Sequence, residues 1–224
     1  NPGNLSFRGS LRSKIYVDKS ELIARTNEAL CTEQKYICVS RPRRFGKSMA
    51  ANILAAYYDR NEDTEELFQS LAISKEKSYK EHLNQYDVIK INMQEFLSMS
   101  ETMEEMLEML KNYLVSDFKE TFHEIQFRDE KNLIQVMKDV FRYTKCPFVI
   151  LIDEWDCLFR EYKQNKDAQK KYLDFLRAWL KDKDYVALAY MTGILPIKKY
   201  GSHSALNMFT EYSMTEPGEL AAYF

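Results

Sequence analysis

The feature that most constrains this chain's fold is a short apolar run that leads into a loop and then into a helix-forming run. Residues 36–40 are mostly apolar, residues 41–48 read Arg-Pro-Arg-Arg-Phe-Gly-Lys-Ser, and residues 49–58 favour a helix. A loop of this kind, ending in Gly-Lys-Ser, directs backbone N–H groups and a helix N-terminus at phosphate oxygens. The pattern therefore predicts a strand, a phosphate-binding loop and a helix.

The residues at the end of this loop each have a chemical reason to be there. Gly46 lets the backbone approach phosphates without an intervening Cβ. Lys47 supplies a point charge for the β- and γ-phosphates, and the Ser48 hydroxyl is a ligand for Mg²⁺. We expect the nucleotide to contact a set of consecutive loop residues, namely Arg43, Arg44, Phe45, Gly46, Lys47, Ser48 and Met49.

The loop departs from the usual pattern, Gly-x-x-x-x-Gly-Lys-Ser/Thr, at its first position. Arg41 stands where the first glycine is expected, and Pro42 fixes φ and removes a backbone donor. We therefore expect a stiffer loop than a glycine-rich one. Because Gly-Lys-Ser or Gly-Lys-Thr arises by chance in about one chain in ten of this size, a second motif is needed to support a function.

That second motif lies at the end of another apolar run. Residues 147–152 read as a parallel strand covered on both faces, and Asp153 and Glu154 follow directly. Ligands of open α/β sheets bind at the carboxyl ends of the strands. We predict Asp153 and Ser48 as Mg²⁺ ligands, and Glu154, as general base, with Lys47 as the catalytic residues. A solvated acidic helix cap is the alternative for the two acids.

The distance between the two motifs along the chain indicates the topology. Asp153 is too far from Lys47 for its strand to follow the phosphate-loop helix directly, and residues 86–93 supply an intervening strand. Residues 185–193 supply a later strand. Thr192 near its end is explained either by a γ-phosphate contact or by a backbone hydrogen bond. We predict an α/β fold, specifically a P-loop NTPase of the additional-strand (ASCE) type, three-layer αβα with a mostly parallel sheet and helix-rich insertions.

Apolar periodicity and capping residues predict helices between these strands. The methionine-rich stripe of residues 100–122 is interpreted as core packing, with partner binding as the alternative. The predicted helices cover residues 18–30, 49–59, 64–71, 74–83, 100–122, 132–143 and 172–180.

The predicted domain organisation has three parts. Residues 1–14 are a polar, irregular N-terminal arm, and residues 15–215 form the P-loop ATPase-like domain. Residues 216–224 start a helix and stop within an apolar run, which indicates the beginning of a truncated C-terminal region.

Composition narrows the classes of function. A chain of 224 residues with 45% hydrophobic residues can bury the core of one large α/β domain. A net charge of −2 argues against direct nucleic-acid binding. The four cysteines show no Cys-x-x-Cys spacing, and neither a signal peptide nor a membrane-length apolar span is present. These features predict a cytoplasmic protein without a membrane partner.

With both motifs placed, the chain resembles the AAA-ATPase-like family of bacterial P-loop proteins. The loop sequence Arg-Pro-Arg-Arg-Phe-Gly-Lys-Ser is specific to that family, so the missing first glycine is a family trait. Trp155 replaces a usual tyrosine, and the arginine usual after Thr192-Gly193 is absent, with Lys198 offering charge but no fork geometry. The matching segments are residues 16–23, 41–48, 151–156, 192–193 and 209–212.

The resemblance implies Mg²⁺-dependent ATP binding and slow hydrolysis that drives a conformational switch in a larger multidomain protein. Family members often precede a C-terminal PD-(D/E)XK nuclease-like domain, which is the expected partner, and an oligomer is compatible with the family. A nucleotide-binding signalling or scaffold module with little turnover is the alternative, since no arginine finger is identifiable in the chain. A small-molecule kinase and a scaffold that binds no nucleotide are further alternatives.

Overall fold

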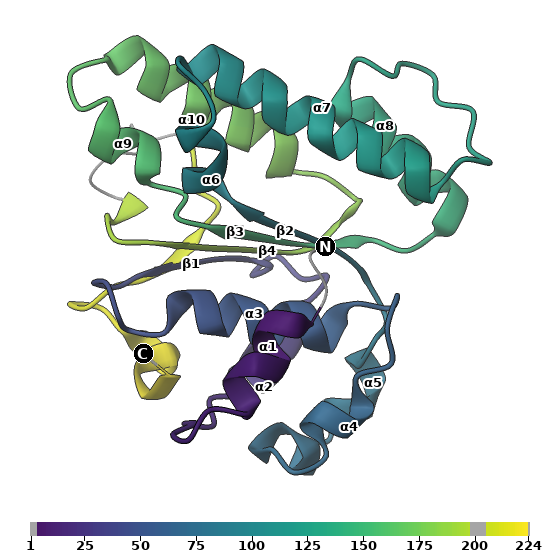
Figure 1. Cartoon of the computed structure of the whole chain (residues 1–224), viewed down its shortest axis with the longest axis vertical. Helices are drawn as coiled ribbons and strands as arrows, with labels where there is room; N and C mark the ends of the chain where they lie inside the picture. The colour runs from purple at the N-terminus through teal and green to yellow at the C-terminus, as the bar shows by residue number, and fades with distance from the viewer. Residues whose placement is uncertain (1–3, 198–204, 224) are drawn as a thin grey trace.

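A computed structural model of the chain describes residues 4–197 and 205–223. Within them a five-stranded parallel sheet lies between two layers of helices (Figure 1). The strand order is β2-β3-β4-β1-β5. The prediction of an α/β fold with a mostly parallel sheet is therefore confirmed. The strands are β1 (Tyr36–Ser40), β2 (Asp87–Asn92), β3 (Phe148–Asp153), β4 (Val186–Gly193) and β5 (Thr210–Tyr212).

The helices divide between the two faces of the sheet in chain order (Figure 1). The first half of the chain covers one face with α1 (Leu5–Leu11), α2 (Leu22–Ala29), α3 (Lys47–Tyr58), α4 (Glu65–Phe68), the 3₁₀ helix η1 (Ala72–Lys75) and α5 (Tyr79–His82). The other face carries α6 (Met93–Ser98), α7 (Met103–Thr121), α8 (Leu133–Thr144), α9 (Cys157–Glu161) and α10 (Lys166–Leu180). A second 3₁₀ helix, η2 (Gly218–Tyr223), ends the described chain.

Strand side chains alternate between two hydrophobic clusters. In β3, Val149 and Leu151 pack with the α3 face, whereas Ile150 and Ile152 pack with the α7–α10 face. Successive side chains of a strand point to opposite faces, so a strand covered on both sides is apolar at every position. This explains why the apolar run of residues 147–152 identified a buried strand.

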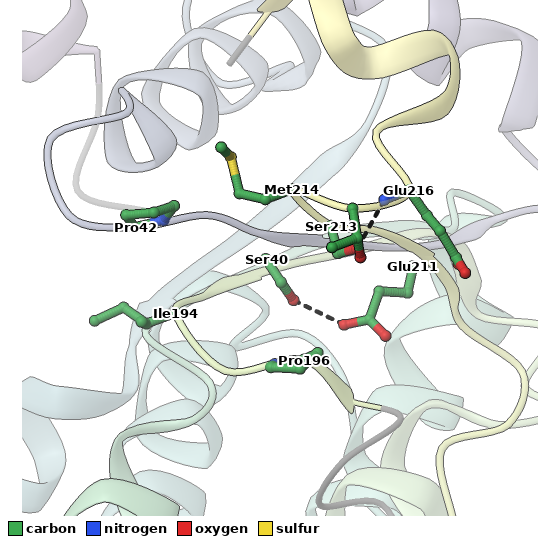
Figure 2. A pocket seen from close by; sticks show the side chains of 9 residues that line it. Ser40, Pro42, Ile194, Pro196, Glu211, Ser213, Met214 and Glu216 are labelled. Carbon is green, nitrogen blue, oxygen red and sulfur yellow. Dashed lines mark hydrogen bonds between the residues drawn. The ribbon is translucent and has the colours of Figure 1, made fainter.

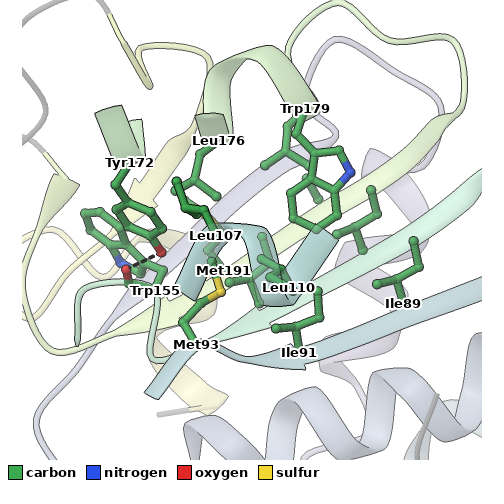
Figure 3. Packing of buried hydrophobic residues seen from close by; sticks show 14 of the residues in the cluster. Ile89, Ile91, Met93, Leu107, Leu110, Trp155, Tyr172, Leu176, Trp179 and Met191 are labelled. Atoms are coloured by element: carbon green, nitrogen blue, oxygen red, sulfur yellow. Dashed lines mark hydrogen bonds between the residues drawn. The ribbon is translucent and has the colours of Figure 1, made fainter. Parts of the chain in front are cut away.

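The cluster under α7 and α10 is built from large side chains. Figure 3 shows Trp179 and Leu176 of α10 packing above Ile89 and Ile91 of β2, with Leu110 of α7 between them. Within the same cluster, the Tyr172 hydroxyl donates a hydrogen bond of 2.7 Å to the Trp155 carbonyl.

The interpretation of the methionine-rich helix as part of the core is confirmed. Met103, Met106 and Leu110 of α7 are at most 1% exposed, whereas Tyr113 on its outer side is 56% exposed. The apolar stripe of α7 therefore belongs to the cluster that includes Ile89 and Ile91 of β2, and α7 also contacts α6, α8 and α10.

The expectation of an irregular N-terminal arm is wrong for residues 5–11, which form α1. Phe7 is fully buried and stacks on Phe68 with 5.2 Å between ring centroids. A seven-residue segment has too few apolar positions to show a helical period, and one buried aromatic supplies the packing instead. The predicted domain boundaries stay a prediction.

Other elements differ in extent or went unpredicted. Helix α10 begins at Lys166, six residues before its predicted start, because the Asn165 side chain accepts a hydrogen bond from the Ala168 N–H and caps it. The short elements α6, α9 and β5 were not predicted, since segments of so few residues carry little periodic signal. No helix in the described parts of the chain is long and apolar enough to cross a membrane.

We expect Leu176→Ala to lower the free energy of unfolding by about 2–5 kcal/mol, because Leu176 is fully buried and its truncation leaves a cavity. The matched control is Leu5→Ala at a residue that is 77% exposed, where the change should stay within about 0.5 kcal/mol. Urea unfolding followed by circular dichroism measures both. Equal losses in the two variants would contradict this core assignment.

Candidate functional site

The polar residues of both motifs lie where several strands of the parallel sheet reach their carboxyl ends. In the strand register, Ser40 of β1 lies opposite Gly193 of β4, and Asn92 of β2 lies opposite Asp153 of β3. The loop of residues 41–46 leaves β1 at this edge and enters α3. The predicted strand–loop–helix order is therefore present.

The loop ends in a backbone conformation that favours glycine. Gly46 has φ of +80° and is the N-cap residue of α3, and Arg44 also has a positive φ of 70°. Since Gly46 has no side chain with which to cap the helix, the first N–H groups of α3 are left to other partners. A helix N-terminus of this kind attracts anions.

Lys47 is held inside the site. It is 5% exposed, and its Nζ donates a hydrogen bond of 2.9 Å to the Pro42 carbonyl. Burial lowers the pKa of Lys47, while the nearby carboxylates of Glu154 and Asp153 act to raise it. The ammonium group is thus bonded to the loop itself and lies in the field of the acids that follow β3.

The Asp153 carboxylate joins the two motifs. Its Oδ2 accepts a hydrogen bond of 2.5 Å from Ser48 Oγ in the first turn of α3. Its Oδ1 accepts hydrogen bonds from the hydroxyl of Thr192 and from the N–H of Glu154. Asp153 is 5% exposed and Thr192 is fully buried, so this carboxylate connects α3, β3 and β4 in a nearly dry environment.

The Glu154 carboxylate is paired with an arginine that sequence reasoning missed. Arg160 of α9 donates from Nη2 to Glu154 Oε2, and the same nitrogen lies 3.4 Å from Gln94 Oε1 at the start of α6. Glu154 itself has a positive φ of 54°. In the sequence, the only sign of this contact is that Arg160 follows the acids within a few residues. That spacing does not by itself predict a bond between Arg160 and Glu154.

The backbone is closely packed around Asp156 and Gly193. Asp156 is fully buried, and its Oδ2 accepts hydrogen bonds from the N–H groups of Ile194 and Leu195. A Cβ on Gly193 would lie 2.7 Å from Asp156 Oδ1 and equally near the Trp155 ring. Glycine is therefore required after Thr192 because β4 passes against the segment that follows β3.

Arg41, at the position of the missing first glycine, is part of the core. It is 1% exposed, and its Nη1 donates to the carbonyls of Ser40 and Tyr212 at 3.1 and 2.7 Å. Burial lowers the pKa of Arg41. This side chain ties the start of the loop to β5, a contact that no local pattern reveals.

The remaining predicted nucleotide contacts lie on the outer side of the loop. Arg43, Arg44 and Phe45 are exposed, and Met49 is half-buried in the first turn of α3. The structure thus brings Lys47, Ser48, Asp153, Glu154 and Thr192 together, while Arg43 and Arg44 face solvent. Lys198 is outside the described residues.

A cavity of about 520 Å³ adjoins the loop at Pro42 (Figure 2). Within it, Glu211 accepts hydrogen bonds from the Ser40 hydroxyl at 2.8 Å and from the Ile197 N–H at 2.7 Å. The polar cluster around Asp153 lies outside its lining, so that cluster, and not this cavity, defines the candidate site. The lining consists of Ser40, Pro42, Ile194, Pro196, Glu211 and residues 213–216.

The donor set at Asp153 suits a magnesium ion bound together with phosphates. Across residues 4–197 and 205–223, no group of three or more His, Cys, Asp or Glu side chains is arranged to hold a metal alone. Mg²⁺ in phosphate sites takes one or two protein oxygens and completes its shell with phosphates and water. The Ser48 hydroxyl and the Asp153 carboxylate, 2.5 Å apart, are such oxygen donors.

The comparisons with known proteins agree with the motifs. A family model described as AAA-ATPase-like, a predicted AAA-ATPase, matches residues 8–202. The chain therefore belongs to the AAA-ATPase-like family, and the resemblance drawn from the loop and the acids is confirmed. No curated protein matches the sequence. Membership in a family of predicted ATPases supports nucleotide binding by this chain.

We expect Gly193→Ala to destabilise the fold by about 1–3 kcal/mol, because the new methyl group has no space beside Asp156 and Trp155. The control is Gly9→Ala in α1, where a Cβ meets nothing within 4 Å and alanine should stabilise the helix by about 0.5–1 kcal/mol. Thermal unfolding followed by calorimetry reports both signs. Stability losses of the same sign and size would rule out this account of Gly193.

Proposed function

We propose that this domain binds ATP with Mg²⁺ and hydrolyses it slowly, driving a conformational switch in a larger protein. The observation that carries the proposal is the hydrogen bond between Ser48 in the first turn of α3 and Asp153 at the end of β3. These residues come from motifs far apart in the sequence, and their meeting is what a nucleotide and metal site requires. The family match supports the same reading.

The strand order supports the additional-strand type. Strand β4 lies between β1, which carries the loop, and β3, which carries Asp153 and Glu154. The inserted strand brings Thr192 to the same edge of the sheet, where its hydroxyl donates to Asp153. Thr192 in this proposal orients that carboxylate and lies near the terminal phosphate.

Phosphate binding in this proposal depends on an exchange of partners at Lys47. Its ammonium group donates to the Pro42 carbonyl, which a phosphate oxygen would replace. The N–H groups at the start of α3 and the exposed Arg43 and Arg44 add further positive potential. Ser48 and Asp153 would hold Mg²⁺, which when bound neutralises charge on the phosphates.

Glu154 is the general base of this proposal. Its carboxylate would accept the proton of the attacking water at Oε1 or Oε2. Arg160 already bonds Oε2, so this oxygen can take up the proton only after that ion pair is loosened. Turnover by the domain is therefore expected to be slow, and a change at α9 would adjust it.

The Arg160–Glu154 ion pair also favours the second candidate function, a nucleotide-binding switch module with little turnover. If the pair persists when nucleotide is bound, Glu154 cannot activate water. In either version we propose that residues 15–215 act as one domain and that a nuclease-like region receives the switch. A cytoplasmic location and self-association are compatible with both.

We expect Lys47→Ala to weaken Mg-ATP binding by about 10- to 100-fold, since it removes a charge-assisted contact worth about 1.5–3 kcal/mol. Isothermal titration calorimetry measures the affinity, with Lys14→Ala as a control at an exposed lysine. Unchanged affinity in Lys47→Ala would exclude this phosphate site, and absence of any heat with the unaltered protein would exclude nucleotide binding.

Glu154→Gln should retain Mg-ATP binding and reduce phosphate release by at least about 100-fold, because an amide cannot take up the proton. Glu108→Gln on the exposed side of α7 is the control. Sustained phosphate release by the unaltered protein supports hydrolysis. A single burst of phosphate release followed by a stall with retained diphosphate supports the switch module. Normal turnover in Glu154→Gln would exclude Glu154 as the general base.

Asp153→Asn should reduce the gain in ATP affinity that Mg²⁺ produces, since a carboxylate ligand becomes a neutral amide. Affinity for ATP measured with excess chelator should change much less than affinity for Mg-ATP. Asp174→Asn, an exposed acid of α10, serves as the control. An equal Mg²⁺ effect in Asp153→Asn and the unaltered protein would show that the metal binds elsewhere.

A further inference from the structure

A second lysine lies beside the phosphate loop and comes from a different part of the chain. Lys19 Nζ is 3.4 Å from the position that a Cβ on Gly46 would occupy. Lys19 belongs to the segment between α1 and α2, well before β1, whereas Gly46 is the residue that precedes Lys47. The fold therefore brings a second ammonium group to the glycine on which the loop turns.

The backbone around Lys19 is fixed on both sides by η1. The Asp18 carboxylate accepts hydrogen bonds from the N–H groups of Ser20 and Ala72, at 2.8 and 2.7 Å. The Ser20 hydroxyl accepts from the Ile73 N–H at 3.1 Å, and Ser20 is fully buried. These contacts hold the residues that flank Lys19, so the direction in which its side chain leaves the backbone is set by the fold.

The surroundings of Lys19 suit an ammonium group that meets an anion. The side chain is half-buried, and this burial lowers the pKa of Lys19. A partly desolvated cation gains more from a neighbouring anion than a fully hydrated one does.

We propose that Lys19 is a second phosphate-binding lysine, so that the phosphate chain of a nucleoside di- or triphosphate is held between Lys19 and Lys47. This inference rests on the proposed function and extends it to the N-terminal segment. Binding through Lys19 would couple the phosphate chain to the turn at Asp18 and Ser20, and through it to η1. The α1–α2 region thereby becomes part of the nucleotide site.

The test is Lys19→Met in the full chain, with Mg-ATP and inorganic tripolyphosphate as separate probes in isothermal titration calorimetry. We expect both affinities to fall about 10- to 100-fold, as for loss of one charge-assisted contact. Lys14→Met, an exposed lysine in the preceding turn, should match the unaltered protein. Lys19→Arg, which keeps the charge, should recover most of the affinity.

The outcomes separate this inference from the proposed function. If the unaltered protein binds neither probe, the proposed function fails and the inference fails with it. If it binds and Lys19→Met binds equally well, only the inference is overturned. If Lys19 has a purely structural role, Lys19→Met should unfold at a lower temperature than the unaltered protein when no nucleotide is present. A loss of affinity that this destabilisation fully accounts for would also overturn the inference.

Discussion

The interaction on which the site depends is the set of hydrogen bonds received by the buried Asp153 carboxylate. A buried charge is tolerated only where hydrogen bonds replace its hydration. The Ser48 hydroxyl of α3, the Thr192 hydroxyl of β4 and the N–H of Glu154, directly after β3, make that replacement. The carboxylate therefore fixes the first turn of α3 against the ends of β3 and β4. A shift of any of these elements would leave the Asp153 carboxylate without one of its hydrogen-bond partners. This cost keeps the two motifs in their relative positions.

A second buried charge fixes the other end of the loop. Arg41 lies in the core and donates to the carbonyls of Ser40 and Tyr212, so the loop is anchored to the edge strand β5 as well as to α3. In a glycine-rich loop the first position supplies flexibility. Here the long side chain of Arg41 instead anchors the loop by hydrogen bonds, and Pro42 follows it with a fixed φ. The loop is thus held at its beginning by Arg41 and turned at its end by Gly46.

Each charged group of the site is bonded to another part of the protein. Lys47 donates to the Pro42 carbonyl, Arg160 pairs with Glu154, and Asp156 accepts from backbone N–H groups beyond β4. In the proposed function, a phosphate oxygen would replace the Pro42 carbonyl as the acceptor for Lys47, and catalysis would require Arg160 to release Glu154. Release of Arg160 from Glu154 would affect α9, which contains Arg160, and the neighbouring helix α6, which provides Gln94. The proposed function would therefore link nucleotide binding to conformational change through the same few hydrogen bonds.

The sequence by itself determined the buried strands, the phosphate loop and the acids that follow β3, because each is a local pattern of apolar runs, glycine and charge. It also placed Lys47, Ser48, Asp153, Glu154 and Thr192 at one edge, since parallel strands end together. It missed α1, where one buried phenylalanine does the packing, and it assigned no role to Arg41, Arg160 or Lys19. Arg41 reaches Tyr212 of β5, Lys19 lies beside Gly46, and Arg160 reaches back on Glu154 only through the turn into α9. Such contacts depend on how the layers pack, and packing distances are not written in any local pattern, so only the tertiary structure decided them.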